Sequence, residues 1–314
     1  MQPHRMTAHD WLLLGALSVL WGGSFLFYKV LATALPPLTT VLGRLSLAWL
    51  ALWLGLRAAG APVRIPRAEW HRFLLLAALN NVVPFSLYAW GETRVSSGTA
   101  AILNAMTPVF TLLVSALVLR TERLGGRALA AVVCGFAGVA VLVGPSALLG
   151  DSLAGQAACL GAALSYGFGI PYGRRFAGLE PARMALGQLA AGTLLLLPLE
   201  LAIDRPWTLA SPGAAGWASL LGLALASTAL AYLIFFRILA RAGATNIALV
   251  TFLVPVSALL LGGLLLSERV TPQALAGMAL IALALAAIDG RPLRGLTVLA
   301  GGRRTGRQGD EPAR

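Results

Sequence analysis

The sequence predicts an all-α membrane protein of ten transmembrane helices, built as two inverted five-helix repeats with both termini in the cytoplasm. Three observations lead to this prediction. Of the 314 residues, 58% are hydrophobic and only 11% are charged, whereas about a quarter of the residues of a soluble protein are charged. The apolar residues are gathered in runs long enough to cross a bilayer. The cations between the runs are divided unequally between its two sides.

Ten apolar runs are each about 20 residues long, the length that crosses the roughly 30 Å hydrocarbon layer. Helices are expected because lipid offers open backbone no hydrogen-bond partners, and because these runs lack the polar–apolar alternation of membrane strands. The expected spans are 11–31, 37–57, 72–91, 98–119, 125–144, 153–173, 183–203, 214–237, 243–266 and 271–289. Proline, glycine, arginine or acidic residues mark the breaks, which lie at 36–37, 62–67, 92–97, 120–126, 144–152, 174–183, 204–213, 237–241 and 267–272.

The cations predict the orientation, since cytoplasmic loops carry an excess of Lys and Arg. If the amino terminus is cytoplasmic, 19 of the 24 cations lie on the cytoplasmic side and only Arg94, Arg205 and Arg269 lie on the other. The remaining two, Lys29 and Arg44, fall within spans. The basic tail at 290–314 is expected to be a disordered cytoplasmic anchor, and a nucleic-acid-binding arm is the less favoured alternative.

An internal repeat divides the chain into units at 10–144 and 152–289. At a shift of 147 residues, the rarer residue types align: Trp70 with Trp217, Arg94 with Arg241 and Pro108 with Pro255. At a shift of 144, Arg44 aligns with Gln188. Because each unit has five spans, the second enters the membrane from the opposite side. Inverted repeats are a recurring plan of secondary transporters, whose substrate site lies near mid-membrane between the halves.

Several segments resemble a known family. Residues 97–111 (SGTAAILNAMTPVFT), closed by TER at 121–123, are similar to the EamA-type signature of the drug/metabolite transporter superfamily. A second copy occupies 244–255 and is closed by SER at 267–269. Residues 20–25 (LWGGSF), with Lys29 after them, are similar to the first helix of that family.

The resemblance covers about residues 10–290 and implies a bacterial inner-membrane carrier, often an exporter of amino acids or related metabolites. Arg44 occupies a position where the second helix of the family often has an arginine. The second half departs from this pattern because Gln188 stands opposite Arg44. Only the first half would therefore supply a cation to recognise a charged group.

The two cations within spans are the first candidates for a site. Arg44 lies roughly 10–12 Å along its helix, at 1.5 Å per residue. At the centre of a membrane helix an arginine costs about 2.5–3.5 kcal/mol, so it is expected to face the bundle interior or a wet cavity. It could bind substrate, or it could only bond neighbouring carbonyls. Lys29 could act as a substrate or gating cation, or it could extend to the membrane interface.

Polar residues recur at the same depth in both halves. Pro108 and Pro255 are candidate helix hinges, because each leaves the carbonyl four residues earlier without its N–H; those carbonyls belong to Asn104 and Thr251. The pair Asn80–Asn81 aligns with residues 227–228. Such residues could form a substrate ring, or they could join helices by hydrogen bonds of about 0.6 kcal/mol. With the deeper aromatic residues, the cavity candidates are Arg44, Trp21, Asn80, Asn81, Tyr88, Asn104, Tyr166, Gln188, Thr228, Tyr232 and Thr251.

Enzyme chemistry finds little support, and no cofactor or metal is expected. The three histidines lie at the cytoplasmic boundary or outside it, and the two cysteines stand alone in apolar runs. The carboxylates Glu92, Asp151, Asp204 and Glu268 are expected at outer ends or in loops. Glu200, within about a turn of the outer end of its helix, is the best candidate for a proton site.

The sequence thus predicts a secondary transporter of the bacterial inner membrane that moves a small metabolite by alternating access. The favoured substrate is an amino acid or a related carboxylate-bearing compound, and export is the favoured direction. A membrane-embedded enzyme and a non-transporting scaffold are the alternatives. The expected partners are the metabolite and the lipid bilayer, without nucleic acid, and a homodimer is left open.

Overall fold

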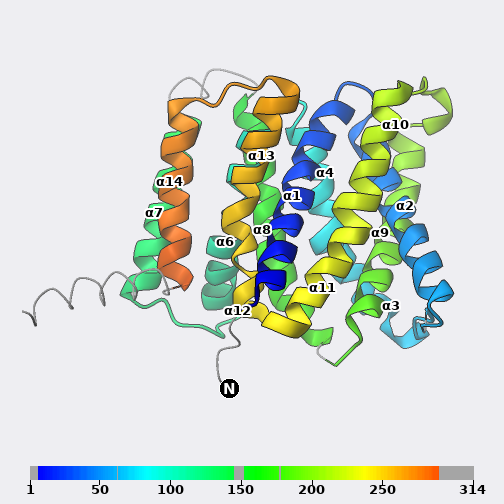
Figure 1. Ribbon diagram of the computed structural model, residues 1–314, viewed down its shortest axis with the longest axis horizontal. Coiled ribbons are helices and arrows are strands. Elements are labelled where there is room, and N and C mark those ends of the chain that lie inside the picture. Colours follow the sequence, from blue (N-terminus) through cyan, green and yellow to red (C-terminus); the bar gives the residue numbers. More distant parts are fainter. Residues whose placement is uncertain (1–5, 62, 145–151, 177, 290–314) are drawn as a thin grey trace, which may run out of the picture.

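The computed structural model describes residues 6–61, 63–144, 152–176 and 178–289, and every regular element in these ranges is a helix (Figure 1). The first half contains α1 (Ala8–Leu31), α2 (Pro37–Ala58), α3 (Trp70–Ala77), η2 (Ala78–Val82), α4 (Val83–Gly91), α5 (Ser97–Asn104), α6 (Thr107–Leu113), η3 (Val114–Val118) and α7 (Gly126–Val143). The second contains α8 (Ser152–Gly173), α9 (Pro181–Ile203), α10 (Gly213–Leu221), η7 (Gly222–Leu230), α11 (Ala231–Ala242), α12 (Ala244–Ile247), α13 (Val250–Leu266) and α14 (Pro272–Asp289). Short helical turns at Arg67–Glu69, Arg174–Phe176 and Pro206–Thr208 lie between spans.

These helices confirm the prediction of an all-helical membrane fold in two halves. Within the described ranges, nine helical stretches are long and apolar enough to cross a membrane, and α13 is a shorter apolar helix of 17 residues. Four residues of α12 precede α13 and lengthen the ninth span. The expected tail at 290–314 lies outside the described residues, as does Asp151.

The two halves interlock. The second helix of each half packs against the other, α2 on α9, and so does the fifth, α7 on α14. These two pairs lie at opposite edges of the bundle (Figure 1). The first helix of each half packs against the fourth span of the other: α1 on α13, and α8 on α5 and α6. The bundle centre is therefore built from both halves.

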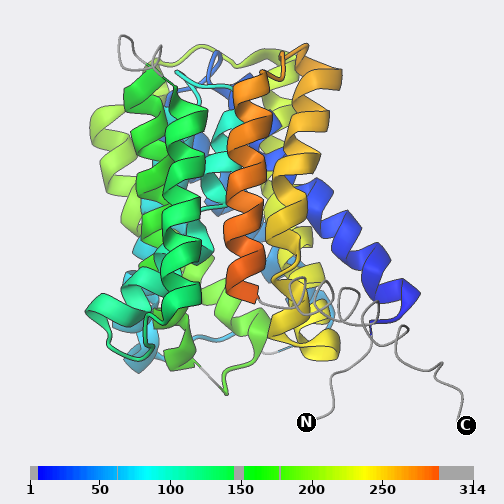
Figure 2. The same ribbon diagram turned by 90° about the vertical axis from the view of Figure 1, so that its left-hand side faces the viewer.

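The first described helix begins, and the last one ends, on the same side of the bundle. Figure 2 shows the start of α1 and the end of α14 near its lower edge. An even number of crossings requires this arrangement. Assignment of that side to the cytoplasm remains a prediction from the cations, and below we call it the inner side and the opposite one the outer side.

The fourth span is interrupted just before Pro108. Helix α5 ends at Asn104, and α6 begins at Thr107 with Pro108 in its first turn. The hydroxyl of Thr107 donates to the Asn104 carbonyl at 2.7 Å. This bond replaces the one that proline cannot make, as the absence of its N–H requires.

The ninth span breaks at a different place. Helix α13 runs through Pro255 without interruption. The break lies at residues 248–249, where the N–H of Thr251 bonds the carbonyl of Ala248 at 3.1 Å and that of Phe252 bonds Leu249 at 3.1 Å. The hinge role of Pro255 stays a prediction.

The third and eighth spans each widen into a π-helix at mid-length, η2 and η7, a feature the sequence did not predict. Side-chain hydroxyls compensate for the disturbed backbone ladder. Ser165 of α8 donates to the carbonyl of Leu79 at 2.8 Å, and Thr228 donates to that of Leu223 at 2.8 Å. Because π-bulges often occur at functional sites, the polar pairs at 80–81 and 227–228 become the natural place to look for one.

Candidate functional site

Arg44 lies at the contact between the two halves. Its side chain points into the bundle, and only 4% of the residue is exposed. Nε donates to the hydroxyl of Thr228 in η7 at 2.8 Å, and Nη1 donates to the hydroxyl of Tyr28 in α1 at 2.8 Å. The guanidinium carbon lies 3.7 Å from the centroid of the Phe85 ring in α4. Three other spans, from both halves, therefore hold the arginine of α2.

The positive charge of Arg44 has no carboxylate beside it. Among the described residues, no Asp or Glu oxygen comes within 4.0 Å of the guanidinium, and Nη2 makes no hydrogen bond there. Its electrostatic neighbours include the phenols of Tyr166 and Tyr232. Phenols and aromatic faces stabilise a cation without neutralising it, so the charge remains available to an anionic group.

The positions that correspond to Arg44 and Thr228 in the internal repeat are Gln188 and Asn81, and both are uncharged. The side-chain nitrogen of Asn81 in η2 donates to the hydroxyl of Tyr232 in α11 at 3.2 Å, while the other amide atom, Oδ1, is buried without a partner among the described residues. Helix α9, which carries Gln188, packs against η2, as α2 packs against η7. Gln188 is only 6% exposed, and within the described ranges its side chain makes no hydrogen bond. Both amides are therefore buried and uncharged.

The two members of each polar pair face different neighbours. Asn81 and Thr228 bond Tyr232 and Arg44, as described above. Asn80 instead packs directly against Gly169 of α8, and Ser227 lies beside Gly23 of α1. The first member of each pair therefore lies at a close helix contact. Only the second member contacts Arg44 or Tyr232. Below, the central cluster means Arg44, Tyr28, Phe85, Thr228, Asn81 and Tyr232. Asn80 thus does not lie with Asn81 as the sequence interpretation had them.

Three other candidates meet at the break in the fourth span. The hydroxyl of Tyr88 donates to Oδ1 of Asn104 at 2.8 Å. The rings of Tyr88 and Tyr166 have their centroids 6.4 Å apart, and Phe25 meets Tyr88 edge-on at 5.5 Å. These contacts place the phenols beside the end of α5.

Trp21 and Thr251 have fewer polar contacts. The ring of Trp21 in α1 lies 5.6 Å from that of Phe235 in α11. Thr251 is the second residue of α13 and is partly buried, with no side-chain hydrogen bond in the described part of the chain. Nothing here connects either residue to Arg44.

Two residues important to the site were not in the predicted set. Tyr28 accepts a bond from Arg44, and the available signal was a phenol beside Lys29 within the first apolar run. Phe85 stacks on the guanidinium, but a phenylalanine in an apolar span gives no signal in one sequence. Lys29, one of the predicted cations, contacts the backbone that follows α4 on the outer side. Its Nζ donates to the carbonyl oxygens of Glu92 at 2.9 Å and Val95 at 2.7 Å.

Carboxylates join helix ends on the outer side. Glu268 accepts bonds from the N–H of Ser97 at 3.0 Å and from its hydroxyl at 2.8 Å, at the start of α5. Asp204 accepts from the N–H of Thr39 at 2.8 Å, and Glu200 accepts from its hydroxyl at 3.1 Å. Each of these side chains lies near the first turn of a helix, where a negative charge is favourable.

Glu92 differs from the expectation of a peripheral carboxylate. It follows α4 directly on the outer side, yet it is 0% exposed. Neither carboxylate oxygen has a partner among the described residues. Burial raises the pKa of this carboxyl well above its ordinary value, and the charge of Lys29 opposes that shift. The sequence placed Glu92 at the end of a span, but only packing could bury it.

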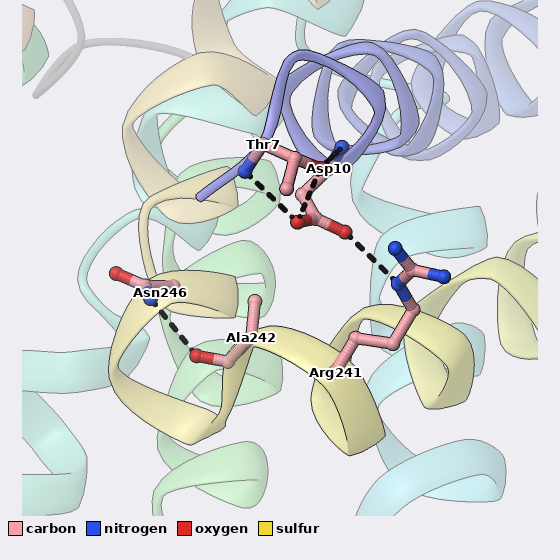
Figure 3. Close-up of polar contacts among 5 residues, drawn as sticks. All are labelled: Thr7, Asp10, Arg241, Ala242 and Asn246. Atoms are coloured by element: carbon pink, nitrogen blue, oxygen red, sulfur yellow. Dashed lines mark hydrogen bonds and ion pairs between the residues drawn. The ribbon is translucent and has the colours of Figure 1, made fainter. Parts of the chain in front are cut away.

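An ion pair joins α1 to α11 on the inner side (Figure 3). Nε of Arg241 lies 3.2 Å from Oδ1 of Asp10, whose other oxygen accepts from the N–H and hydroxyl of Thr7 at 3.0 and 2.7 Å. The side chain of Asp10 is 6% exposed, whereas that of Arg241 is 48% exposed.

Two open pockets also lie on the inner side, around the start of α3. One has a volume of about 510 Å³ and is lined by His71, Arg72, Tyr172 and Arg175. The other, of about 760 Å³, is lined by Arg64, Ile65, Pro66, Trp70 and Arg183. Their basic linings agree with the excess of cations predicted for the cytoplasmic side.

Comparison with known proteins identifies the class. A family model described as the EamA-like transporter family matches twice, at residues 9–144 and 153–288. The chain is 27% identical over 274 residues to the uncharacterized transporter YoaV of Bacillus subtilis, covering 86% of this chain and 93% of that protein. It is 32% identical over 260 residues to the uncharacterized inner membrane transporter YedA of Escherichia coli, covering 79% and 80%.

Two further comparisons concern a possible substrate class and the fold. The chain is 32% identical over 247 residues to a probable terminal-alkyne amino-acid exporter of Streptantibioticus cattleyicolor, covering 76% of this chain and 79% of that protein. A solved crystal structure has a TM-score of 0.63 at 19% identity and covers 88% of this chain and 95% of its own. At that identity the match supports the fold alone.

The doubled family match agrees with the two interlocked halves and with a helical fold that crosses the membrane many times. It also excludes the alternative of a membrane-embedded enzyme. The chain belongs to the EamA-like transporter family, within the drug/metabolite transporter superfamily, and is a multi-pass membrane transporter.

Proposed function

We propose that the protein exports a small metabolite with a carboxylate group, an amino acid or a close relative, across the bacterial inner membrane. The observation that carries this proposal is the buried guanidinium of Arg44, which lies between the two halves without a carboxylate partner. A relative named as a probable amino-acid exporter supports the substrate class and the direction. The name of the Escherichia coli relative supports the inner membrane.

The substrate carboxylate would accept hydrogen bonds from Arg44, the strongest kind of interaction open to it in a dry site. Tyr232 and Asn81 supply neutral oxygens in the same cluster. These oxygens can accept bonds from an ammonium group. A zwitterion therefore fits the lopsided charge of the site better than a dianion.

Alternating access would use the contacts between halves. Arg44 and Thr228 belong to different halves, as do Asn81 and Tyr232. A substrate that bonds Arg44 competes with Thr228 and Tyr28 for its donors. Binding can then shift the balance between inward-open and outward-open states, because the substrate's contacts differ between them. The outer carboxylate contacts and the inner Asp10–Arg241 pair would open in turn.

Counterflow in proteoliposomes tests this function. Vesicles loaded with an unlabelled mixture of amino acids should take up radiolabelled amino acids, and Arg44→Gln should abolish that uptake. Arg94→Gln is the matched control, since Arg94 is exposed on the outer side and contacts Trp90 and Thr93. Uptake by Arg44→Gln at the wild-type rate would reject the role of Arg44. An absence of uptake by the wild-type protein would reject the substrate class.

The cytoplasmic placement of both termini and a homodimer also remain proposals. Reporter fusions at the two ends test the first. Mass measurement of the purified protein in detergent tests the second. A non-transporting scaffold, the remaining alternative, predicts no counterflow of any metabolite.

A further inference from the structure

Glu92 is the one carboxylate of the described residues that is wholly enclosed with both oxygens unpartnered. It follows Gly91, the last residue of α4, on the outer side of the bundle. An ionised carboxylate loses its hydration on burial and needs hydrogen bonds or a paired cation in return. The geometry therefore fits a neutral, protonated carboxyl group.

The groups that face Glu92 come from every side. They are Lys29 of α1, Arg44 of α2, Cys159 of α8, Glu268 before α14, and the phenols Tyr28 and Tyr88. Two of these are cations and one is a second carboxylate. None forms an ion pair with Glu92 within 4.0 Å.

Lys29 provides a second, independent feature. Its ammonium group donates to the backbone carbonyl of Glu92, at 2.9 Å, and to that of Val95, rather than to the carboxylate. A rotation of the Glu92 side chain can therefore bring the carboxylate to a cation that already lies beside its own backbone. When the Glu92 carboxyl is protonated, Lys29 keeps its bonds to the two backbone carbonyls. When it is ionised, the carboxylate would compete with those carbonyls for the ammonium group of Lys29.

We propose that Glu92 binds the proton that drives export, and that its protonation allows the outer ends of α1, α4 and α5 to close. This inference rests on the proposed function of the chain as an exporter. With the outer side open, water reaches Glu92 and the carboxylate takes up one proton from outside. The neutral group is then buried as the outer side closes without substrate. When the inner side opens, the proton passes to the cytoplasm through the central cluster, and the site can accept substrate.

Each cycle thus exchanges one inward proton for one outward substrate molecule. Glu200, the carboxylate predicted from the sequence as a proton site, is the competing candidate. It is 1% exposed, and one of its oxygens accepts a bond from Thr39. Its other oxygen has no partner in the described ranges. Glu200 thus has the Thr39 hydroxyl as a donor, whereas no described residue donates to Glu92.

The first experiment needs no ligand. Infrared difference spectra of the protein in liposomes, titrated from acidic to alkaline buffer, should contain the C=O band of a protonated carboxyl group near neutral pH. That band should be lost in Glu92→Gln and kept in Glu200→Gln. A band that persists in Glu92→Gln, or its absence from the wild-type protein, would overturn the proposal.

The second experiment separates coupling from transport. Radiolabelled amino acids serve as the probe, with counterflow at equal pH compared with uptake driven by a pH gradient. Glu92→Gln should keep counterflow at equal pH. The acceleration of its uptake by the pH gradient should be about tenfold smaller than that of the wild-type protein. Glu92→Asp should restore part of this acceleration. A gradient response unchanged in Glu92→Gln would overturn the role of Glu92. An absence of wild-type counterflow would instead count against the proposed function, and the infrared result would still decide the protonation of Glu92.

Discussion

The guanidinium of Arg44 in α2 donates a 2.8 Å hydrogen bond to the hydroxyl of Thr228, a residue 184 positions later in the chain. The same hydroxyl donates to the carbonyl of Leu223 within the π-helix η7. One threonine therefore supports both the central cation of one half and the irregular backbone of the other.

Thr228→Val is expected to weaken both transport and folding. The substitution keeps the shape of the side chain but removes the hydroxyl that bonds Nε of Arg44 and the Leu223 carbonyl. Hydrogen bonds to charged groups contribute about 1.5–3 kcal/mol, so a fall of about tenfold in transport efficiency and a lower Tm are expected. Ser227→Ala is the control, because the buried hydroxyl of Ser227 has no partner among the described residues. Equal effects of the two variants would contradict this account.

Tyr88→Phe should loosen the break in the fourth span. It removes the donor to Asn104, the last residue of α5, and leaves the amide oxygen without that bond. The expected loss of stability is about 1 kcal/mol, measured by chemical or thermal unfolding in detergent. Tyr172→Phe provides a comparison at the inner end, where Tyr172 lines an open pocket. A Tm of Tyr88→Phe no lower than that of Tyr172→Phe would count against the bond.

Asp10→Asn should favour opening on the inner side. The change removes the charge that pairs with Arg241 at 3.2 Å but keeps an oxygen for the Thr7 cap. Because half of the Arg241 side chain is exposed, a double-mutant cycle with Arg241→Gln should give a coupling energy of only about 0.2–1 kcal/mol. Hydrogen exchange at the start of α1 and the end of α11 should increase. Unchanged exchange in Asp10→Asn would argue that the pair does not hold this end.

Gly277→Leu should separate α7 from α14. A Cβ at Gly277 would lie 2.8 Å from the carbonyl oxygen of Gly138, so any larger residue forces the helix backbones apart. Overpacking of this kind costs about 1–3 kcal/mol, which should appear as a lower Tm. Gly15→Leu is the matched control, because a Cβ at Gly15 meets no atom within 4 Å. A similar loss in both variants would indicate a general effect of removing glycine.

The stability of the folded protein should fall as the pH rises, because the buried carboxyl group of Glu92 then loses its proton. Burial raises the pKa of this carboxyl in the folded state well above the ordinary value of 4.5, with Lys29 as the main opposing influence. The favourable contribution is therefore complete below the unfolded pKa and is lost as the pH rises through the folded pKa. Glu92→Gln, which stays neutral, should flatten that part of the profile of Tm against pH. A profile with the same slope in both proteins would contradict the buried neutral carboxyl.

Much of the fold could be predicted from the sequence because its signals are local. A run of about 20 apolar residues is by itself long enough to predict a membrane-spanning helix. The cations between the runs predict which helix ends lie on the same side of the membrane. Proline at position 108 predicts a lost backbone bond wherever the helix lies, and the break after Asn104 confirms it. The inward direction of Arg44 follows from the cost of exposing a cation to lipid.

The tertiary structure decided which of these residues meet. The sequence placed Asn80 and Asn81 at one depth, but the π-helix turns Asn80 toward Gly169 and Asn81 toward Tyr232. Such a bulge depends on packing against other helices, so the local sequence does not predict it. Likewise, Glu92 reads as a carboxylate at the end of a span, and only the surrounding helices bury it completely. Hydropathy and charge act on each segment separately, whereas burial and pairing depend on neighbours that are distant in the chain.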